Sequence, residues 1–369
     1  DRYGSAHPQP DATHFSGAMG RHDLKWESHT EFVTYSAFGS GVSSRAFDPM
    51  EADVFPEDWL AGAPGARLTS VLIRVEEMPE DEAALLAKLD GWFVPDSLAT
   101  SKVVDGAAVV AGDFRIDAAG HMRFAVFVQK GTGQRRIGRI VQRLCEVETY
   151  RAMSMLGLIR ARALSARLNE LDPQLSELVS GMHATDHSPE TVLETLLNIS
   201  AQLESLAVRF SFRFAATEAY EAIVNQRISV LREARIEGRQ TFGEFMMRRY
   251  DPAMRTVKSV DARLRSMAER ATRAAELLRT RVDVERSAQN QRLLESMDAR
   301  ADVQLRLQTT VEGLSVVAIS YYAVNLLAYI AYPVTESLGV SKGMSMALLV
   351  PVVILGVWAM VRRIRKKLH

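Results

Sequence analysis

Residues 314–334, LSVVAISYYAVNLLAYIAYPV, and residues 344–361, MSMALLVPVVILGVWAMV, decide the fold of this chain. Neither stretch contains Asp, Glu, Lys or Arg, and each approaches the length of about 20 apolar residues that a helix needs to cross a membrane. The alternative is a hairpin buried in a soluble core, but two uncharged runs joined by a short loop are hard to enclose in a domain of this size. The sequence therefore predicts a transmembrane helical hairpin.

Basic side chains flank this hairpin unevenly. Five of them follow the second stretch, whereas the connecting loop contains only Glu336 and Lys342. The positive-inside rule then places both termini in the cytoplasm of a bacterial cell, with the protein crossing the inner membrane twice. The basic tail is expected to lie against anionic lipid headgroups. The membrane-orienting residues are Arg362, Arg363, Arg365, Lys366 and Lys367.

A stripe of small and neutral polar side chains runs along the first stretch and the segment before it. Spacings of three and four residues place these side chains on one helical face. Two interpretations fit: a helix–helix interface in which small and hydrogen-bonding residues pack closely, or the lining of a water-filled pore between several copies. Both predict a homo-oligomer. The stripe contains Gln304, Gln308, Ser315, Ala318, Tyr322, Asn325 and Tyr329.

The segment before the hairpin is predicted to be helical. No proline interrupts it between Pro252 and Pro333, and about 80 residues of helix would extend about 120 Å, which is typical of a stalk or a coiled coil. Residues 134–180 suit one or two helices, with a break near Gly157 or Pro173 in the second case. A further helix, which Ser188 can cap, is expected to run from Pro189 to about Ile236.

The N-terminal third carries strand signals. Apolar and polar residues alternate like a strand over 24–39, β-branched residues gather in 67–77, and residues 107–128 are typical of a hairpin. Residues 78–90 begin with acids, as a helix does. Because Asp1 is not an initiator methionine, we expect this domain to be truncated.

The predicted fold class is therefore α+β. It combines a mixed α/β domain over 1–133, a helical stalk or coiled coil over 134–312, a transmembrane hairpin over 313–361 and a basic cytoplasmic tail over 362–369.

The formal net charge of zero is a cancellation. Residues 1–133 hold 11 basic and 20 acidic side chains, whereas residues 134–369 hold 34 and 25. The acidic part can complement the basic part of the same or a neighbouring chain. Acids interspersed among the basic residues argue against a nucleic-acid partner. The single cysteine, Cys145, excludes an internal disulfide.

One metal site is conceivable in the N-terminal part. Glu27, His29 and Glu31 alternate along a predicted strand, so their side chains would share one face and offer two carboxylates and an imidazole to a divalent cation. The alternative is a solvated strand face. No metal, nucleotide or Rossmann motif and no anchor for Ser/His/Asp catalysis is present. We therefore predict no catalytic residue and no cofactor beyond this candidate cation.

Several strings resemble an uncharacterised bacterial family of predicted membrane-anchored proteins, a domain of unknown function. The resemblance covers most of the chain and implies no activity and no catalytic residues. The strings are Trp26–Phe32 (WESHTEF), Glu148–Arg151 (ETYR), Ala275–Val284 (AELLRTRVDV), Gln289–Met297 (QNQRLLESM) and Thr310–Val324 (TVEGLSVVAISYYAV).

A more distant resemblance is architectural. An α/β domain, a long helix that enters a first span, a short loop, a second span and a basic tail are similar to CorA-type divalent-cation channels. This resemblance implies a homopentamer with an axial pore. Those channels carry Gly-Met-Asn at the outer end of the first span, whereas this chain has Tyr329–Pro333 (YIAYP) there.

Two functions are consistent with these patterns. The first is a membrane-anchored, oligomeric protein that faces the cytoplasm and acts as a non-enzymatic scaffold or partner-binding module. The alternative is a CorA-like divalent-cation channel or transporter. A membrane-tethered enzyme would have only Glu27, His29 and Glu31 to support it. The expected partners are membrane lipid, other copies of the chain and an unidentified protein, and no nucleic acid.

Overall fold

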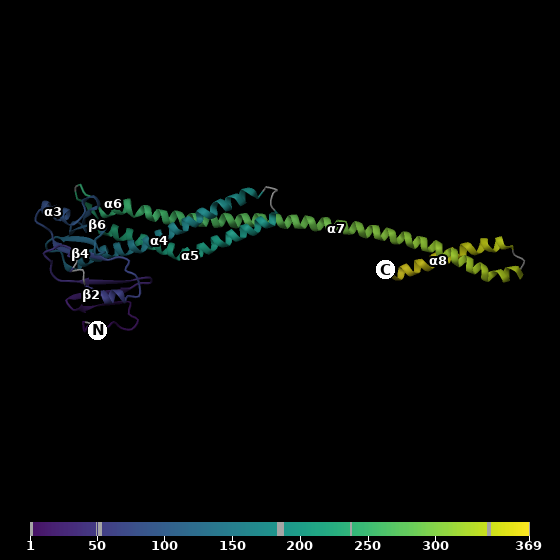
Figure 1. Cartoon of the computed structure of the whole chain (residues 1–369), viewed down its shortest axis with the longest axis horizontal. Helices are drawn as coiled ribbons and strands as arrows, with labels where there is room; N and C mark the ends of the chain where they lie inside the picture. The colour runs from purple at the N-terminus through teal and green to yellow at the C-terminus, as the bar shows by residue number, and fades with distance from the viewer. Residues whose placement is uncertain are drawn as a thin grey trace. The chain divides into compact units, whose positions relative to one another are not determined.

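The structure of the chain is a computed structural model, and it is α+β as the sequence predicts (Figure 1). It describes residues 3–48, 50, 54–182, 188–236, 238–337 and 341–368. The chain divides into two compact units, Asp1–Glu276 and Leu277–His369.

A three-stranded antiparallel sheet begins the first unit. The His29 amide donates to the Phe32 carbonyl oxygen at 2.8 Å and closes a tight turn between the second and third strands. The alternating stretch 24–39 is therefore two strands rather than one, because the turn reverses the chain. The elements are β1 (His14–Met19), β2 (His22–Ser28), β3 (Val33–Phe38) and a short helix, α2 (Glu57–Ala61).

A five-stranded mixed sheet follows, with the strand order β4-β7-β6-β5-β8. β4 and β7 pair in parallel, and the other neighbours are antiparallel. The predictions of a strand in 67–77 and a hairpin in 107–128 are confirmed. The elements are β4 (Val71–Glu77), α3 (Glu82–Trp92), the 3-10 turn η1 (Pro95–Ser97), β5 (Ala99–Val103), β6 (Ala108–Ile116), β7 (Met122–Val128) and β8 (Ala234–Arg235).

Helices cover both faces of the mixed sheet. Successive strand residues point to opposite faces. Accordingly, Val110 belongs to a buried cluster with Ile140 of helix α4 (Gln134–Gly181), whereas its neighbour Val109 belongs to a cluster with Leu89 of α3. Both faces are therefore apolar, and the sheet forms the middle layer between α3 and the beginning of the helical region.

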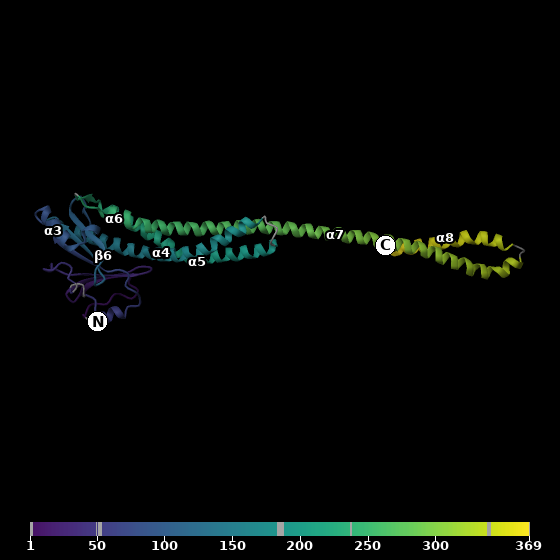
Figure 2. The ribbon, with the colours of Figure 1, turned by 45° about the horizontal axis from the view of Figure 1, so that its top comes forward.

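Three helices form a bundle that extends from this sheet: α4, α5 (Pro189–Leu231) and the first part of α7 (Asp251–Ser337) (Figures 1 and 2). Their buried residues recur every three or four positions, which places them on one face of each helix. Burying one such leucine contributes about 1.5–3 kcal/mol. Buried residues include Leu144, Ala161, Leu168 and Leu175 of α4, Leu196, Leu203, Phe210 and Val224 of α5, and Met254, Leu264, Met267 and Ala271 of α7.

Helix α4 is continuous through both positions at which a break was considered. At Gly157 it approaches α5 closely, since a Cβ atom added there would lie 2.2 Å from the Thr217 Oγ1 atom. Pro173 lies inside the helix, and the buried Leu171 and Leu175 on either side of it keep the segment packed. The packing of this face offsets the hydrogen bond that proline removes.

Helix α5 ends at Leu231 rather than near Ile236 as predicted. Arg232 adopts a left-handed φ of 48°, which ends the helix, and Ala234–Arg235 then pairs with β5 as an edge strand. Pairing with an available sheet edge overrides a helical pattern that continues in the sequence.

A short helix that the sequence pattern did not reveal, α6 (Phe242–Arg249), follows the edge strand. Thr241 and Glu244 form a capping box at its beginning, in which each side chain accepts a hydrogen bond from the other residue's backbone. The Glu233 carboxylate also accepts from the Phe242 and Gly243 amides, both at 2.9 Å.

Polar contacts join α7 to α4 on the surface of the bundle. Arg263 and Arg270 contact the Asp172 carboxylate at 2.9 Å and 3.1 Å. The hydrogen bond from Arg263, together with Arg270, lowers the pKa of Asp172 although burial acts in the opposite direction. Nearer the sheet, the Ser154 and Tyr250 hydroxyls lie 2.8 Å apart in a buried hydrogen bond.

The second unit contains the remainder of α7 and helix α8 (Lys342–Leu368). The two helices lie side by side in both views (Figures 1 and 2). Ser320 of α7 and Val353 of α8 are buried, at 4% and 7% exposure. Most apolar side chains on the two helices are exposed, among them Leu314 and Leu348.

The close approach at Gly157 predicts a stability difference between two glycines of the same helix. Gly157→Ala places a methyl group against Thr217 and is expected to lower the free energy of unfolding by about 1–3 kcal/mol. Gly138 is exposed, and nothing lies within 4 Å of an added Cβ, so Gly138→Ala is expected to raise it by about 0.5–1 kcal/mol. Urea unfolding followed by circular dichroism measures both, and equal effects would contradict the close packing.

Candidate functional site

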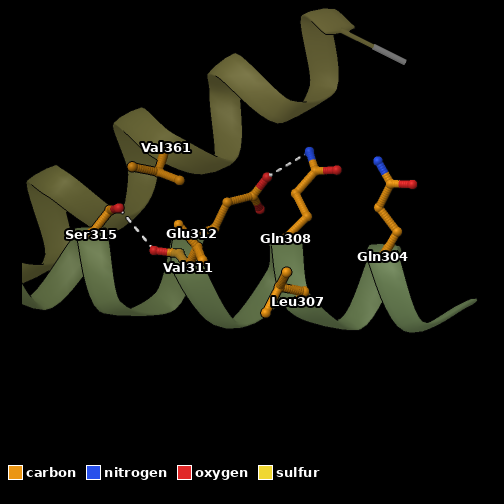
Figure 3. A pocket seen from close by; sticks show the side chains of 7 residues that line it. All are labelled: Gln304, Leu307, Gln308, Val311, Glu312, Ser315 and Val361. Atoms are coloured by element: carbon orange, nitrogen blue, oxygen red, sulfur yellow. Dashed lines mark hydrogen bonds between the residues drawn. The ribbon is translucent and has the colours of Figure 1, made fainter. Parts of the chain in front are cut away.

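A cavity of about 410 Å³ lies where the end of α8 meets α7, just before the first apolar stretch (Figure 3). Its wall is mostly one face of α7, and α8 contributes a single valine. The lining residues are Gln304, Leu307, Gln308, Val311, Glu312, Ser315 and Val361.

The polar groups of the cavity are two amides, a carboxylate and a hydroxyl. The Gln308 side-chain amide donates to the Glu312 carboxylate at 3.3 Å, and the Ser315 hydroxyl donates to the Val311 carbonyl oxygen at 2.8 Å (Figure 3). One carboxylate and two amides suit a cation or a polar headgroup. They offer no pair of acid and base and no activated nucleophile, so the cavity has the character of a binding site.

Three residues of the predicted polar stripe line this cavity, and the others continue along α7. All seven lie on one unbroken helix, as their spacing requires. At about 100° per residue, Ser315, Tyr322 and Tyr329 lie on the side of α7 opposite Ser320, which is buried beside α8. Tyr322 and Tyr329 are 67% and 83% exposed. Val361 of α8 lies beside the stripe at the cavity, and Asn325 is half-buried, whereas Tyr322 and Tyr329 stay exposed in the single chain.

Two helices are long and apolar enough to cross a membrane by length and composition. One apolar window lies within Phe242–Ala331 and the other within Gly343–Arg363, and these two ranges overlap the uncharged stretches 314–334 and 344–361. Very little of either window is buried.

The basic cluster begins at the C-terminal end of the second window. Arg362 and Arg363 are exposed, and the Arg362 guanidinium lies 4.9 Å from the centre of the Trp358 ring. Arg365, Lys366 and Lys367 continue α8, but their side chains lie outside the described residues, as do those of Glu336 and Lys342, which were expected in the connecting loop but belong to the end of α7 and the start of α8.

The structure does not bring Glu27, His29 and Glu31 together as metal ligands. β2 ends at Ser28, so His29 and Glu31 lie in the turn and not on a strand face. The three side chains have other partners: Glu27 pairs with Lys25 at 2.9 Å and His29 stacks on Phe32. In the described part of the chain, no group of three or more His, Cys, Asp or Glu residues is placed to hold a metal ion.

Glu31 instead joins the first sheet to the helical bundle. Its two carboxylate oxygens accept hydrogen bonds from the Arg213 guanidinium of α5 at 2.9 Å and 3.0 Å, and the Tyr220 hydroxyl donates to it at 2.8 Å. Beside this pair, Phe32 packs against Tyr150 and Tyr220. We call these five residues the turn clamp. Burial and the hydrogen bond to Glu31 raise the pKa of Tyr220 to about 12.

The chain matches one family of proteins over almost its whole length. Residues 1–368 match the model of a family described as a protein of unknown function, DUF3422. The chain belongs to the DUF3422 family. No curated protein and no solved structure matches it, so the architectural resemblance to CorA-type channels gains no support.

Two of the strings through which the DUF3422 chain resembles its family meet at the turn clamp. Phe32 ends WESHTEF and Tyr150 lies in ETYR, and their ring centres are 6.0 Å apart. ETYR also contains Glu148, which is buried and accepts hydrogen bonds from Arg151 and from Thr69 at 2.7–2.9 Å. The sequence offered these strings as signals, but their spacing along the chain did not show that they touch.

The raised pKa of Tyr220 predicts how the turn clamp responds to alkaline pH. Near pH 8 the hydroxyl is protonated and donates to Glu31, so Tyr220→Phe should lower the free energy of unfolding by about 1 kcal/mol. Because the folded pKa lies above the ordinary value of 10.0, this stabilisation is lost as the pH rises from about 10 to 12. Urea unfolding of both proteins at several pH values measures the difference, and a difference that stays constant above pH 10 would contradict this role of the hydroxyl.

Proposed function

We propose that this DUF3422 protein is a membrane-anchored scaffold that assembles through α7 and presents its N-terminal unit to a protein partner. The observation that carries the proposal is the pair of apolar, exposed helices, with a polar stripe on α7 that stays largely exposed beyond the cavity at Val361. In water this surface would be costly, since exposed apolar area of this extent is typical of membrane or protein contacts.

Membrane anchoring is supported by the arrangement at the end of α8. An apolar window is followed at once by Arg362 and Arg363, with Trp358 one turn earlier. Tryptophan and basic residues are enriched where a helix leaves the hydrocarbon. This order supports a hairpin in the bacterial inner membrane with both termini in the cytoplasm.

Self-assembly is supported by the composition of the stripe. In a membrane, helices associate through small residues that allow close packing and through side chains that hydrogen-bond across the interface. Ser315, Ala318 and Asn325 are residues of this kind, and in the single chain Ser315 and Ala318 are exposed and Asn325 is half-buried. A second copy of the chain would supply the missing contacts. The proposal assigns no catalytic step to the protein and no nucleic acid as a partner.

Ion conduction is the rival function. In a ring of copies the same stripe would face a pore, and Gln304, Gln308 and Glu312 would lie at its entrance. The scaffold is preferred because residues 329–333 (YIAYP) stand where CorA-type channels carry Gly-Met-Asn.

A pair of serine-to-cysteine variants tests the assembly. Ser315 lies on the open stripe, whereas Ser320 of the same span is buried on the side of α8. Oxidation in membranes is expected to cross-link Ser315→Cys into dimers and to leave Ser320→Cys monomeric. The native Cys145 should stay silent because burial raises the pKa of its thiol to about 11. Cross-linking only at residue 320, or at neither position, would overturn assembly through the stripe.

Proteoliposomes made with the parent protein separate the scaffold from the channel. The scaffold predicts divalent-cation flux no higher than in empty vesicles. A flux that disappears in Asn325→Leu would contradict the scaffold and favour the pore, because the substitution removes a polar group from the stripe without adding charge.

The basic tail predicts the orientation of the anchor. A fluorescent reporter fused after the last residue should fold in the cytoplasm, and an alkaline phosphatase fused there should be inactive. Replacing the five basic residues of 362–367 by Gln removes the charge difference and is expected to give a mixture of orientations. An active phosphatase on the parent protein would place the C-terminus outside and refute the predicted topology.

A further inference from the structure

A cluster of arginines lies where the beginning of α4 meets the end of α5, in the first unit. We call it the arginine patch. Four of its members come from the first three turns of α4 and two from the last turn of α5 and the residue that ends it. The members are Arg135, Arg136, Arg139, Arg143, Arg227 and Arg232.

The geometry of the two helices brings these side chains to one side. With 3.6 residues per turn, Arg136, Arg139 and Arg143 lie on the same side of α4. The Arg143 guanidinium donates to the Val230 carbonyl oxygen at 3.4 Å, so this side faces the end of α5. Arg232, which ends α5, reaches the β5–β6 turn and contacts Asp105 at 2.7 Å.

The charge of the patch is not balanced by the protein. Asp105 pairs with Arg232, and Glu146 pairs with Arg227. Over the ranges that the structure describes, Arg135, Arg136 and Arg139 form no ion pair, and all three are exposed. The six arginines of the patch therefore have only two carboxylates, Asp105 and Glu146, as ion-pair partners in the described part of the chain.

The positive charges of the patch also repel one another, which disfavours the charged form of Arg143. Burial first, and then the charges of Arg139, Arg227 and Arg232, lower the pKa of Arg143. The N-terminal end of α4 adds to the positive potential, since its first turn has no acid and Gly133 offers no side chain to cap it, whereas the carbonyl groups at the C-terminal end of α5 act in the opposite direction. Like charges gathered from two helices repel one another and create a positive potential that attracts anions.

We propose that the arginine patch binds a ligand with linked phosphate groups, a di- or triphosphate either free or carried by a nucleoside. Guanidinium groups match phosphate oxygens with two parallel hydrogen bonds, and these charge-assisted bonds are about twice as strong as neutral ones. Linked phosphates bring several negative charges to a patch of this size, whereas one carboxylate would leave most of the charge unbalanced. The ligand would connect α4, α5 and the β5–β6 turn.

Titration calorimetry on the full chain in detergent tests the proposal with inorganic triphosphate, and with sulfate at equal ionic strength as the control anion. The double variant Arg136→Gln, Arg139→Gln removes two unpaired members of the patch. Its control is Arg160→Gln, Arg162→Gln, which makes the same charge change at exposed positions of the same helix away from the patch.

Triphosphate should bind the parent protein, and its dissociation constant should be at least about tenfold higher in the patch variant and unchanged in the control variant. Tighter binding of ATP than of triphosphate would assign the ligand to nucleotides, and equal binding would assign it to the free phosphate chain. The proposal fails if triphosphate binds no more tightly than sulfate or if both variants lose affinity equally. If single-stranded RNA displaces triphosphate at a lower concentration than ATP does, the ligand of the patch is a nucleic-acid backbone and the proposal is wrong.

Discussion

Helix α7 runs from Asp251 to Ser337, and each residue along it has a fixed angular relation to the others. In the first unit its apolar face is buried against α4 and α5, with Met254, Leu264 and Ala271 at the contact. In the second unit α8 covers one face of its span and leaves another open. Within the second unit α7 is unbroken, so the residues of the polar stripe stay on one side of it, as their spacing in the sequence predicts. Assembly and anchoring, as proposed, would both depend on this register.

Charge acts in this protein at particular places and not through its net value. Asp172 and Glu31 accept hydrogen bonds from arginines of other elements, and Glu148 accepts one from Thr69 as well as from Arg151 of its own helix, so each carboxylate joins two segments of the first unit. Exposed pairs contribute little stability by themselves, whereas buried carboxylates must be paired to be tolerated. The arginine patch differs from all of these because most of its cations have no carboxylate beside them.

The turn clamp shows why a pattern of side chains can be interpreted in two ways. Glu27, His29 and Glu31 have the spacing of a strand face, but a turn needs only a few residues and can fall inside an alternating stretch without disturbing the pattern. A carboxylate in such a turn is then free to pair with whatever cation the fold brings near. Arg213 lies 182 residues away in the sequence, so no local rule could have selected it.

The sequence by itself determined the fold class, the hairpin of β6 and β7, the helices from Gln134 onward and the two apolar stretches, because periodicity and charge depletion are local properties. The end of α5 at Leu231, the edge strand β8, the partners of Glu31 and the gathering of arginines from α4 and α5 were decided only by the tertiary structure. Each of these depends on a contact between segments that are distant in the sequence: a free sheet edge, a facing helix or a neighbouring turn. Local patterns contain no information about such contacts, since the free energy of each contact exists only when both segments are in place.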